Sequence, residues 1–169
     1  MPKTSYAIAL GSNRRHGRYG SPSAVIRAAA NALSRQDLSV EALSKIYLTP
    51  ALGPAGRSFA NAALLLSTDL EPHELLQCLN GVEYSFGRRS GRRWGPRVLD
   101  LDIILWSEGS WEEPGLIVPH PEMRRRRFVL DPLAELAPDW RDPVSRATVR
   151  QLRFRLASPR PVDRIAAPS

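Results

Sequence analysis

Segments with the apolar pattern of a strand or of a helix follow one another in this chain in the order β-α-β-β-α-β. In chain order, we expect these elements at residues 6–13, 21–36, 38–48, 59–70, 71–87 and 101–106. The two helical segments repeat apolar residues at intervals of three and four, and each has a proline near its first turn, Pro22 or Pro72. The strand at residues 59–70 is apolar enough to lie in the centre of a sheet. This order of elements restricts the possible folds more than any other feature of the sequence.

Such an order predicts an α+β, ferredoxin-like fold, in which an antiparallel four-stranded sheet carries two helices on one face. A short helix at residues 131–138, with Pro132 in its first turn, and a marginal element at residues 149–156 follow the sheet. The 169 residues suit one domain, which we assign to residues 1–156. Residues 157–169 have little to bury and are expected to fray.

The charge of the chain narrows the class of partner without choosing one. The formal net charge is +7, and Lys3 and Lys45 are the only lysines among the 24 basic residues, so nearly all are arginine. This balance suits nucleic acid, phosphorylated small molecules or a compositional habit of the genome. The single cysteine, Cys78, excludes an internal disulfide and a cysteine-cluster metal site. Because the sequence shows neither a membrane-length apolar run nor a signal peptide, we expect a soluble cytoplasmic protein.

The stretch RRWGPRVLDLDIILW, residues 92–106, brings arginines and aspartates to the start of the last predicted strand of the sheet. Asp100 and Asp102 are two positions apart, and side chains alternate along a strand, so both carboxylates point to one side. Two carboxylates that close together favour a cation, and Mg²⁺ prefers carboxylate oxygens together with substrate phosphates. Solvated or arginine-paired aspartates at a strand end remain the alternative for this motif taken alone.

A glycine-containing loop rich in arginine precedes the aspartate pair. Its basic residues are Arg88, Arg89, Arg92, Arg93 and Arg97. Carboxylates for a metal beside arginines for phosphate are the groups that phosphoryl transfer requires, because its catalysis rests on positioning and charge neutralisation. The chain has neither a GxxxxGK(S/T) loop nor a kinase-type GxGxxG loop, so a nucleotide site here follows another design.

Several motifs, spread from about residue 6 to residue 140, occur in the order found in one protein family. They are IALGSN, TPALGP, FANAA, RWGPRVLDLDIILW and VPHPEMRRRRFVLDPLAELAP. With these motifs the chain resembles 6-hydroxymethyl-7,8-dihydropterin pyrophosphokinase of folate synthesis. That family has a ferredoxin-like sheet and transfers the terminal pyrophosphoryl group of ATP to the hydroxymethyl group of the pterin, releasing AMP.

The resemblance implies roles for the aspartate pair and for the residues that contact ATP. Asp100 and Asp102 would hold two Mg²⁺ ions that bridge the ATP phosphates and the attacking hydroxyl. Arg88 and Arg97 would act with them in catalysis. The expected ATP contacts are Glu83, Arg88, Arg93, Trp94, Arg97, Ile103, His120 and Arg126. Among these, Glu83 would either contact the nucleotide or hold the site together.

The resemblance also implies which residues bind the pterin. They are Thr49, Pro50, Leu52, Phe59, Asn61, Asp100 and Phe128. Phe59 and Phe128 would sandwich the ring, Asn61 would hydrogen-bond to its amide-like edge, and the backbone of residues 49–52 would add further hydrogen bonds. On pattern alone, both phenylalanines would be assigned to the core and His120 to a structural or exposed position. Asn61 lies in an otherwise apolar strand and needs a buried partner, which a ligand can provide.

The chain departs from the family pattern at several positions. Gly115 stands where some members carry an arginine, Ala51 where many have a second proline, and Phe59 where tyrosine is common. The basic turn after Asn13 is longer than usual. These departures concern nucleotide affinity and loop behaviour rather than the reaction.

A nucleic-acid-binding module with the same sheet is the main alternative, because a net charge of +7 and four strands would permit it. Such modules carry an RNP-like aromatic pattern, which this sequence lacks, and Asp100 and Asp102 would repel phosphates in the absence of a metal. We therefore expect an ATP- and Mg²⁺-dependent pyrophosphokinase that is monomeric. Its partners would be small-molecule substrates, without nucleic acid or membrane.

Overall fold

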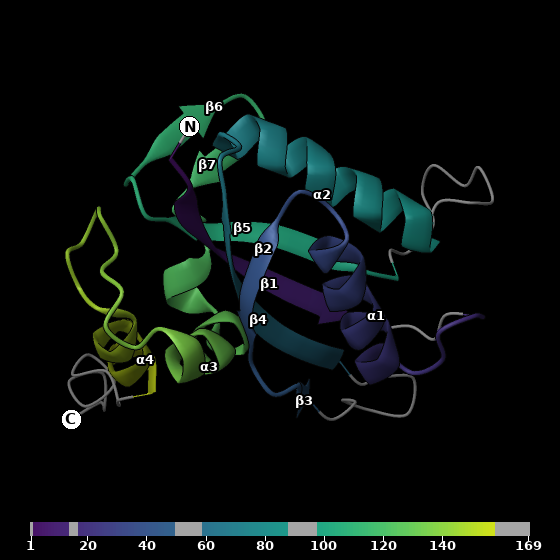
Figure 1. The fold of residues 1–169 in the computed structure, drawn as a ribbon. Coiled ribbons are helices and arrows are strands. Elements are labelled where there is room, and N and C mark those ends of the chain that lie inside the picture. Colours follow the sequence, from purple (N-terminus) through teal and green to yellow (C-terminus); the bar gives the residue numbers. More distant parts are fainter. Residues whose placement is uncertain (1, 14–16, 50–58, 88–97, 158–169) are drawn as a thin grey trace, which may run out of the picture.

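The computed structural model describes residues 2–13, 17–49, 59–87 and 98–157, and Figure 1 shows the fold. In chain order the elements are β1 (Thr4–Ser12), α1 (Pro22–Ser34), β2 (Ser39–Leu43), β3 (Tyr47–Thr49), β4 (Phe59–Thr68), α2 (Pro72–Gly87), β5 (Asp100–Trp106), β6 (Trp111–Glu113), β7 (Leu116–Val118), the 3-10 helix η1 (Met123–Arg125), α3 (Arg127–Leu136) and α4 (Val149–Ala157). The element order expected from the sequence is confirmed as far as β5, except that one predicted strand is divided into β2 and β3.

Neighbouring strands of the main sheet all run antiparallel. Their order is β2-β4-β1-β5, and β3 pairs with β4 as well. Helices α1 and α2 pack on one face of this sheet, and α3 and α4 cover the other (Figure 1). The α+β, ferredoxin-like class is therefore confirmed, with a second helical layer that the sequence pattern did not assign to a face.

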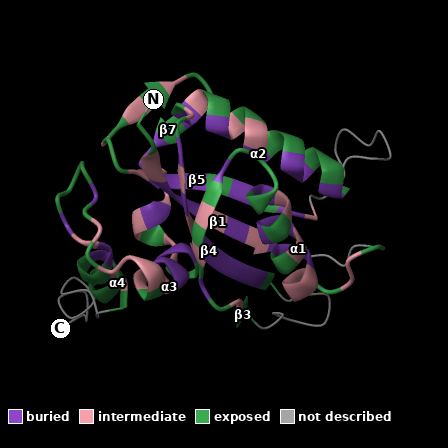
Figure 2. Ribbon diagram, in the orientation of Figure 1, coloured by how far each residue is buried: buried purple, intermediate pink, exposed green. Residues whose placement is uncertain are grey.

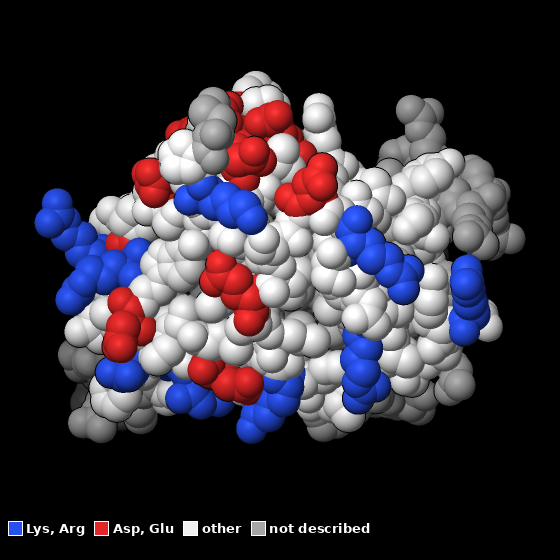
Figure 3. Space-filling model, in the orientation of Figure 1, with Lys and Arg blue, Asp and Glu red and all other residues white. Residues whose placement is uncertain are grey.

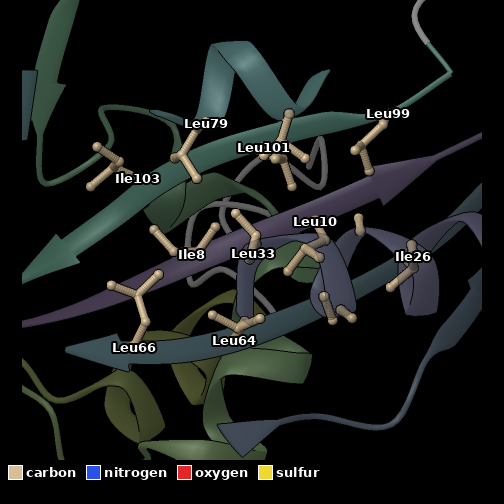
Figure 4. Close-up of a cluster of buried hydrophobic side chains, with 14 of the residues drawn as sticks. Ile8, Leu10, Ile26, Leu33, Leu64, Leu66, Leu79, Leu99, Leu101 and Ile103 are labelled. Carbon is tan, nitrogen blue, oxygen red and sulfur yellow. The ribbon is translucent and has the colours of Figure 1, made fainter. Parts of the chain in front are cut away.

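Side chains that alternate along β1 divide the interior into two cores. Tyr6, Ile8 and Leu10 point toward α1 and α2, where buried residues of β4 and β5 join them (Figure 4). Ala7 points the other way, into a core that includes Leu130 of α3. Both faces of the central strands are therefore covered, and Figure 2 shows that burial is concentrated there.

A buried serine interrupts the strand that the sequence predicts as one element at residues 38–48. The Ser44 N–H donates to the carbonyl of Ala63 at 2.9 Å, and the Ala63 N–H donates to Oγ of Ser44 at 2.9 Å. The hydroxyl thus takes a place in the ladder that a backbone carbonyl normally fills. For this reason β2 ends at Leu43 and β3 begins at Tyr47, and the prediction of one continuous strand is wrong.

Helix α3 begins at Arg127, so the prediction that it starts at residue 131 is wrong. The carbonyl of Arg126 accepts the N–H groups of Val129 and Leu130, both at 3.0 Å, which starts the helix one turn earlier. Pro132 consequently lies inside α3 rather than in its first turn. There it cannot donate to the carbonyl of Phe128, which is a tolerable loss this close to the helix start.

The sequence pattern also does not predict the hairpin of β6 and β7. Each of its strands has three residues, too few for a clear alternation of polar and apolar positions. Its turn contains Gly115 at a φ of +85°, a conformation that favours glycine.

The C-terminal element predicted at residues 149–156 is confirmed as α4 (Val149–Ala157). In the turn before it, the buried carboxylate of Asp142 accepts hydrogen bonds from Nε of Arg124 at 2.6 Å and from the hydroxyl of Ser145 at 2.7 Å. Burial by itself would raise the pKa of Asp142, but these donors and the Val144 N–H outweigh it and hold the pKa below its usual value. The ionised carboxylate thereby joins this turn to η1.

The expected tail falls almost wholly outside the described residues. Ala157 belongs to α4, and residues 158–169 are not described, so the frayed tail and the domain boundary stay predictions. None of the helices in the described ranges is both long enough and apolar enough to cross a lipid bilayer.

Candidate active site

A row of paired residues crosses the sheet where β1, β4 and β5 carry polar side chains. Gly11 of β1 lies opposite Asn61 of β4 on one side and opposite Asp100 of β5 on the other. Two positions earlier on β1, Ala9 lies opposite Asp102. Residues directly opposite each other in a sheet share a face, so Asn61 and both aspartates point to the same side.

Glycine at position 11 leaves room for the amide of Asn61. A Cβ atom on Gly11 would lie 3.3 Å from Oδ1 of Asn61, which is tighter than an ordinary contact. Asn61 itself is only 8% exposed, and among the described residues none hydrogen-bonds to its side-chain amide. Buried amides are normally satisfied, so this group is suited to a ligand in the space above it.

A pocket of about 350 Å³, which we term the central pocket, lies on this side of the sheet. Ala9, Gly11 and Asn61 contribute to its lining from the strands, and Phe128 and Val129 contribute from α3. The residues predicted from the sequence that line the pocket are Thr49, Phe59, Asn61, Asp100, Asp102, His120, Arg126 and Phe128. The fold thus brings expected pterin contacts and expected ATP contacts into one site.

Phe59 and Phe128 are surface residues of this pocket rather than core residues. Each is 47% exposed, so the assignment to the core that pattern alone would give is wrong. Half-exposed rings at a pocket can offer their faces to a flat ligand. The guanidinium of Arg126 lies 5.5 Å from the centre of the Phe128 ring, a cation–π contact that brings a positive charge to the same wall.

The aspartate pair occupies the first positions of β5. Asp100 and Asp102 are exposed and line the central pocket, whereas Leu101 between them points to the opposite, buried face. The Leu101 N–H donates to Oε2 of Glu83 at 2.8 Å, and Glu83 is buried on α2. Glu83 therefore holds the backbone between the two aspartates, and it is not among the described residues that line the central pocket.

His120 lies beside the aspartate pair and is fixed at two points. Its backbone N–H donates to the carbonyl of Ile104 at 3.0 Å, and its Nδ1 accepts the N–H of Glu122 at 3.1 Å. Because Nδ1 is an acceptor, Nε2 is the ring nitrogen that can donate to a ligand. Burial lowers the pKa of His120, and the charge of Arg126 lowers it as well, against the opposing effect of Asp102.

A second pocket of about 270 Å³ adjoins the first, and Asp102 and His120 line both. Its other lining residues are largely apolar: Leu76, Ile103, Gly115, Leu116, Ile117 and Pro121. Ile103, an expected ATP contact, thus lies at this pocket. Among the described residues other than its chain neighbours, no atom lies within 4 Å of the place a Cβ would take at Gly115, the position where some members of the resembled family carry an arginine.

The chain is similar to known proteins over most of its length. The profile of the 7,8-dihydro-6-hydroxymethylpterin-pyrophosphokinase (HPPK) family matches residues 7–138. The chain belongs to this family. Proteins named 2-amino-4-hydroxy-6-hydroxymethyldihydropteridine pyrophosphokinase are 46% identical over 115 residues in Synechocystis sp., 44% over 141 residues in Pseudomonas aeruginosa and 36% over 160 residues in Methylorubrum extorquens. These alignments cover 68%, 82% and 94% of this chain, and 59%, 84% and 96% of the relatives.

The fold of the HPPK family also appears among solved structures. The crystal structure of Plasmodium falciparum HPPK-DHPS matches 91% of this chain and 41% of that chain, with a TM-score of 0.68 and 13% sequence identity. At this identity the likeness concerns the fold alone. The present chain spans less than half of that longer HPPK-DHPS chain.

Some predicted site residues of this HPPK family member lie outside the described residues. They are Pro50, Leu52, Arg88, Arg93, Trp94 and Arg97. Their roles in contacting the pterin or the ATP phosphates stay predictions.

Sequence reasoning about the HPPK motifs missed several residues that line the pockets. In the central pocket these are Ala9, Leu10, Gly11, Ser12, Asn13, Ile104 and Val129, and in the second pocket Leu76, Leu116, Ile117 and Pro121. Most of the first group belong to the motif IALGSN, which carried the resemblance although no role was assigned to its residues. The alternation of small residues at Ala9 and Gly11 on a buried strand is a signal that could have found them.

Proposed function

We propose that this chain transfers the pyrophosphoryl group of ATP to the hydroxymethyl group of 6-hydroxymethyl-7,8-dihydropterin, producing the pterin diphosphate and AMP for folate biosynthesis. Membership of the HPPK family supports this reaction. The observation that carries the proposal is the position of Asp100 and Asp102 in the same pocket as Phe59, Asn61 and Phe128. A metal-binding carboxylate pair beside a site for a flat polar ring is what this transfer requires.

The pterin binds between the rings of Phe59 and Phe128 in this proposal. Its amide-like edge meets the buried side-chain amide of Asn61, which supplies both donors and an acceptor. Thr49 lies opposite Phe59 in the β3–β4 pairing, so the backbone of β3 is close to the same end of the pocket. The remaining part of the pocket, toward Asp100, receives the hydroxymethyl group.

Mg²⁺ suits the groups that face this part of the pocket. Asp100 and Asp102 are exposed carboxylates on one face of β5, and hard oxygen donors of this kind prefer Mg²⁺ completed by water and substrate phosphates. We propose two ions, held by these two residues. When bound, Mg²⁺ would neutralise negative charge on the phosphate oxygens.

The nucleotide occupies the second pocket and the boundary between the two pockets. Ile103 and its apolar neighbours surround the base, while His120 lies where the phosphates must pass toward the aspartates. Nε2 of His120 donates to a phosphate oxygen, and Arg126 adds a positive charge to the lining of the same pocket. Arg88, Arg93, Trp94 and Arg97 complete the nucleotide contacts, as the resemblance implies.

The proposed transfer is a single nucleophilic displacement at the β-phosphorus of ATP. The hydroxymethyl oxygen bonds to the β-phosphorus of ATP, and the bond from that phosphorus to the oxygen bridging the α- and β-phosphates breaks. AMP leaves with the bridging oxygen, and the hydroxyl proton passes to water. The protein holds both substrates in line and supplies fixed charge, which is the main source of catalysis in this class of reaction.

We further propose a monomer that acts in the cytoplasm on small molecules, without nucleic acid or membrane. On the face shown in Figure 3, Lys and Arg side chains stand in separate groups, and acidic side chains gather at the end formed by β6 and the start of α2. On this face the described residues offer no continuous basic track of the kind that a nucleic-acid strand requires.

The nucleotide product tests the proposed reaction. Purified protein is incubated with ATP, Mg²⁺ and 6-hydroxymethyl-7,8-dihydropterin, and the products are separated by anion exchange and identified by mass. We expect AMP and pterin diphosphate in equal amounts, and neither product when the pterin is omitted. Formation of ADP, or ATP consumption that does not depend on the pterin, would contradict the proposal.

A further inference from the structure

Glu135, in the last turn of α3, makes two contacts that reach across to the strands below the central pocket. Its Oε1 accepts the hydroxyl of Tyr47 at 2.9 Å, and its Oε2 accepts the backbone N–H of Lys45 at 3.1 Å. Both partners belong to the segment that follows the break at Ser44. One carboxylate therefore ties α3 to the start of β3.

One aromatic wall of the central pocket lies on α3, and the other lies on β4, the strand that pairs with β3. Phe128 and Glu135 are seven residues apart on α3, which places them on one face of the helix, two turns and about 10 Å apart. On the strand side, Tyr47 lies opposite Asn61 and Thr49 lies opposite Phe59. The contacts between Glu135 and the start of β3 therefore link α3, which carries Phe128, to β4, which carries Phe59 and Asn61.

The phenol of Tyr47 is held in the form that makes this contact. Burial raises its pKa to about 12, and the hydrogen bond to the Glu135 carboxylate contributes to the same shift. A phenol is protonated at neutral pH with or without this shift, so the hydroxyl donates. The ammonium of Lys45 also lies 5.6 Å from the centre of the Tyr47 ring, which further orders the start of β3.

We propose that Glu135 is a positioning residue that sets the separation of the two aromatic walls, and thereby the affinity for the pterin. This inference rests on the proposed function, because it takes the flat ligand between Phe59 and Phe128 to be the pterin. It adds a residue that touches neither substrate and lies outside the described lining of both pockets.

Four variants separate this role from a general contribution to stability. Glu135→Ala removes both contacts, and Tyr47→Phe removes one. Glu135→Gln restores both, because its amide oxygen can accept the Lys45 N–H and its amide nitrogen can donate to the Tyr47 oxygen. Asp131→Asn is the matched control, since Asp131 is another α3 carboxylate, but it accepts from Arg153 of α4 at 2.8 Å rather than from β3.

Calorimetric titration with the pterin and, separately, with a non-hydrolysable ATP analogue measures the effect on each substrate. For Glu135→Ala we expect pterin affinity to fall by about threefold to tenfold, with nucleotide affinity within about twofold. Pterin affinity should lie within about twofold of wild type in Glu135→Gln and also in Asp131→Asn. Pterin affinity unchanged in Glu135→Ala, or lowered equally for both ligands, or lowered as much by Asp131→Asn, would overturn the proposal.

Hydrogen exchange in β3 gives a readout that needs no substrate. Peptides that cover residues 44–49 should exchange faster in Glu135→Ala than in wild type or Asp131→Asn, because β3 loses its tie to α3. If wild-type protein binds no pterin, the proposed function fails, and the exchange rates alone then decide whether Glu135 positions β3. Unchanged exchange in this segment would overturn the positioning role.

Discussion

The N–H of Leu101 donates to Oε2 of Glu83 at 2.8 Å, so a buried carboxylate on α2 holds the strand between the two aspartates of β5. The contact comes from the face opposite the central pocket. It explains how β5 can present Asp100 and Asp102 side by side where the strand begins.

Replacement of Glu83 tests this support. Glu83→Ala leaves a buried N–H without its acceptor, so we expect the free energy of unfolding to fall by about 1–3 kcal/mol and kcat to fall as the aspartates lose their alignment. Glu83→Gln keeps an acceptor oxygen, so its loss of unfolding free energy should be about half that of Glu83→Ala or less. Urea unfolding and steady-state kinetics measure the two effects. An unchanged kcat in folded Glu83→Ala would show that α2 does not position the pair.

Gly11 tests the space left for Asn61. In Gly11→Ala the new Cβ lies 3.3 Å from Oδ1 of Asn61 and displaces the amide, so pterin affinity should fall by about fivefold or more while nucleotide affinity changes little. Gly81→Ala is the control, because no atom of another described residue, its neighbours in the helix aside, lies within 4 Å of the new Cβ. This change in mid-helix should stabilise α2 by about 0.5–1 kcal/mol. Equal pterin affinity in Gly11→Ala and Gly81→Ala, measured by calorimetry, would contradict the role of Asn61.

The aromatic walls make a separate prediction. Phe128→Ala should weaken pterin binding by about 1–3 kcal/mol, by analogy with the stacking of bases on aromatic side chains. Binding of an ATP analogue should change little. Because Phe128 is 47% exposed, the melting temperature should change less than for a core phenylalanine. Calorimetry that finds unchanged pterin affinity in the folded variant would exclude Phe128 as a wall of the pterin site.

Asp142 predicts how stability depends on pH. Its pKa in the folded protein lies below the ordinary value of 3.8, so its contribution is present above about pH 4 and is lost as the pH falls through the folded value. Asp142→Asn should lower the free energy of unfolding at pH 7 by about 2 kcal/mol or more. The difference in free energy of unfolding between Asp142→Asn and wild type should become smaller below about pH 4.

The exposed pair of Asp139 and Arg150 is the control for that experiment. Their side chains are 78% and 67% exposed, so Asp139→Asn should change the free energy of unfolding by less than about 1 kcal/mol. Urea unfolding from pH 3 to pH 7 measures both variants. A loss in Asp142→Asn that does not depend on pH would mean that the charge of this carboxylate is not what stabilises the turn.

Periodicity and the order of elements were sufficient to predict the sheet, because the apolar residues of long strands and helices recur with the spacing of each kind of element. The position of the Asp100 and Asp102 carboxylates on one face of β5 also follows from the sequence, because side chains alternate along a strand. The break at Ser44 could not be predicted, since it depends on a hydrogen bond between its hydroxyl and Ala63 of another strand. The local sequence pattern does not predict a hydrogen bond between residues of different strands.

The residues of the candidate site likewise differ in how far the sequence predicts them. Phe59 and Phe128 look like core residues in a sequence, and only the fold shows that α3 and β4 leave them half exposed at one pocket. Glu135 lies in the motif at residues 118–138, but the motif does not predict its contacts, because its partners Lys45 and Tyr47 lie about 90 residues away. A role that depends on tertiary contacts therefore needs the structure, even for a residue that lies inside a family motif.

The most direct test of the central claim is the turnover of Asp102→Asn across a series of Mg²⁺ concentrations, paired with pterin titration and a melting curve. This change keeps the size of the side chain and removes its charge. We expect turnover to fall by about a hundredfold or more and the Mg²⁺ requirement to rise, since the lost interaction is strongest in the transition state. Pterin affinity should stay within about threefold of wild type, because the ring is held by Asn61 and the two phenylalanines. Turnover within a few-fold of wild type at limiting Mg²⁺ would contradict the assignment of this aspartate pair as the metal site.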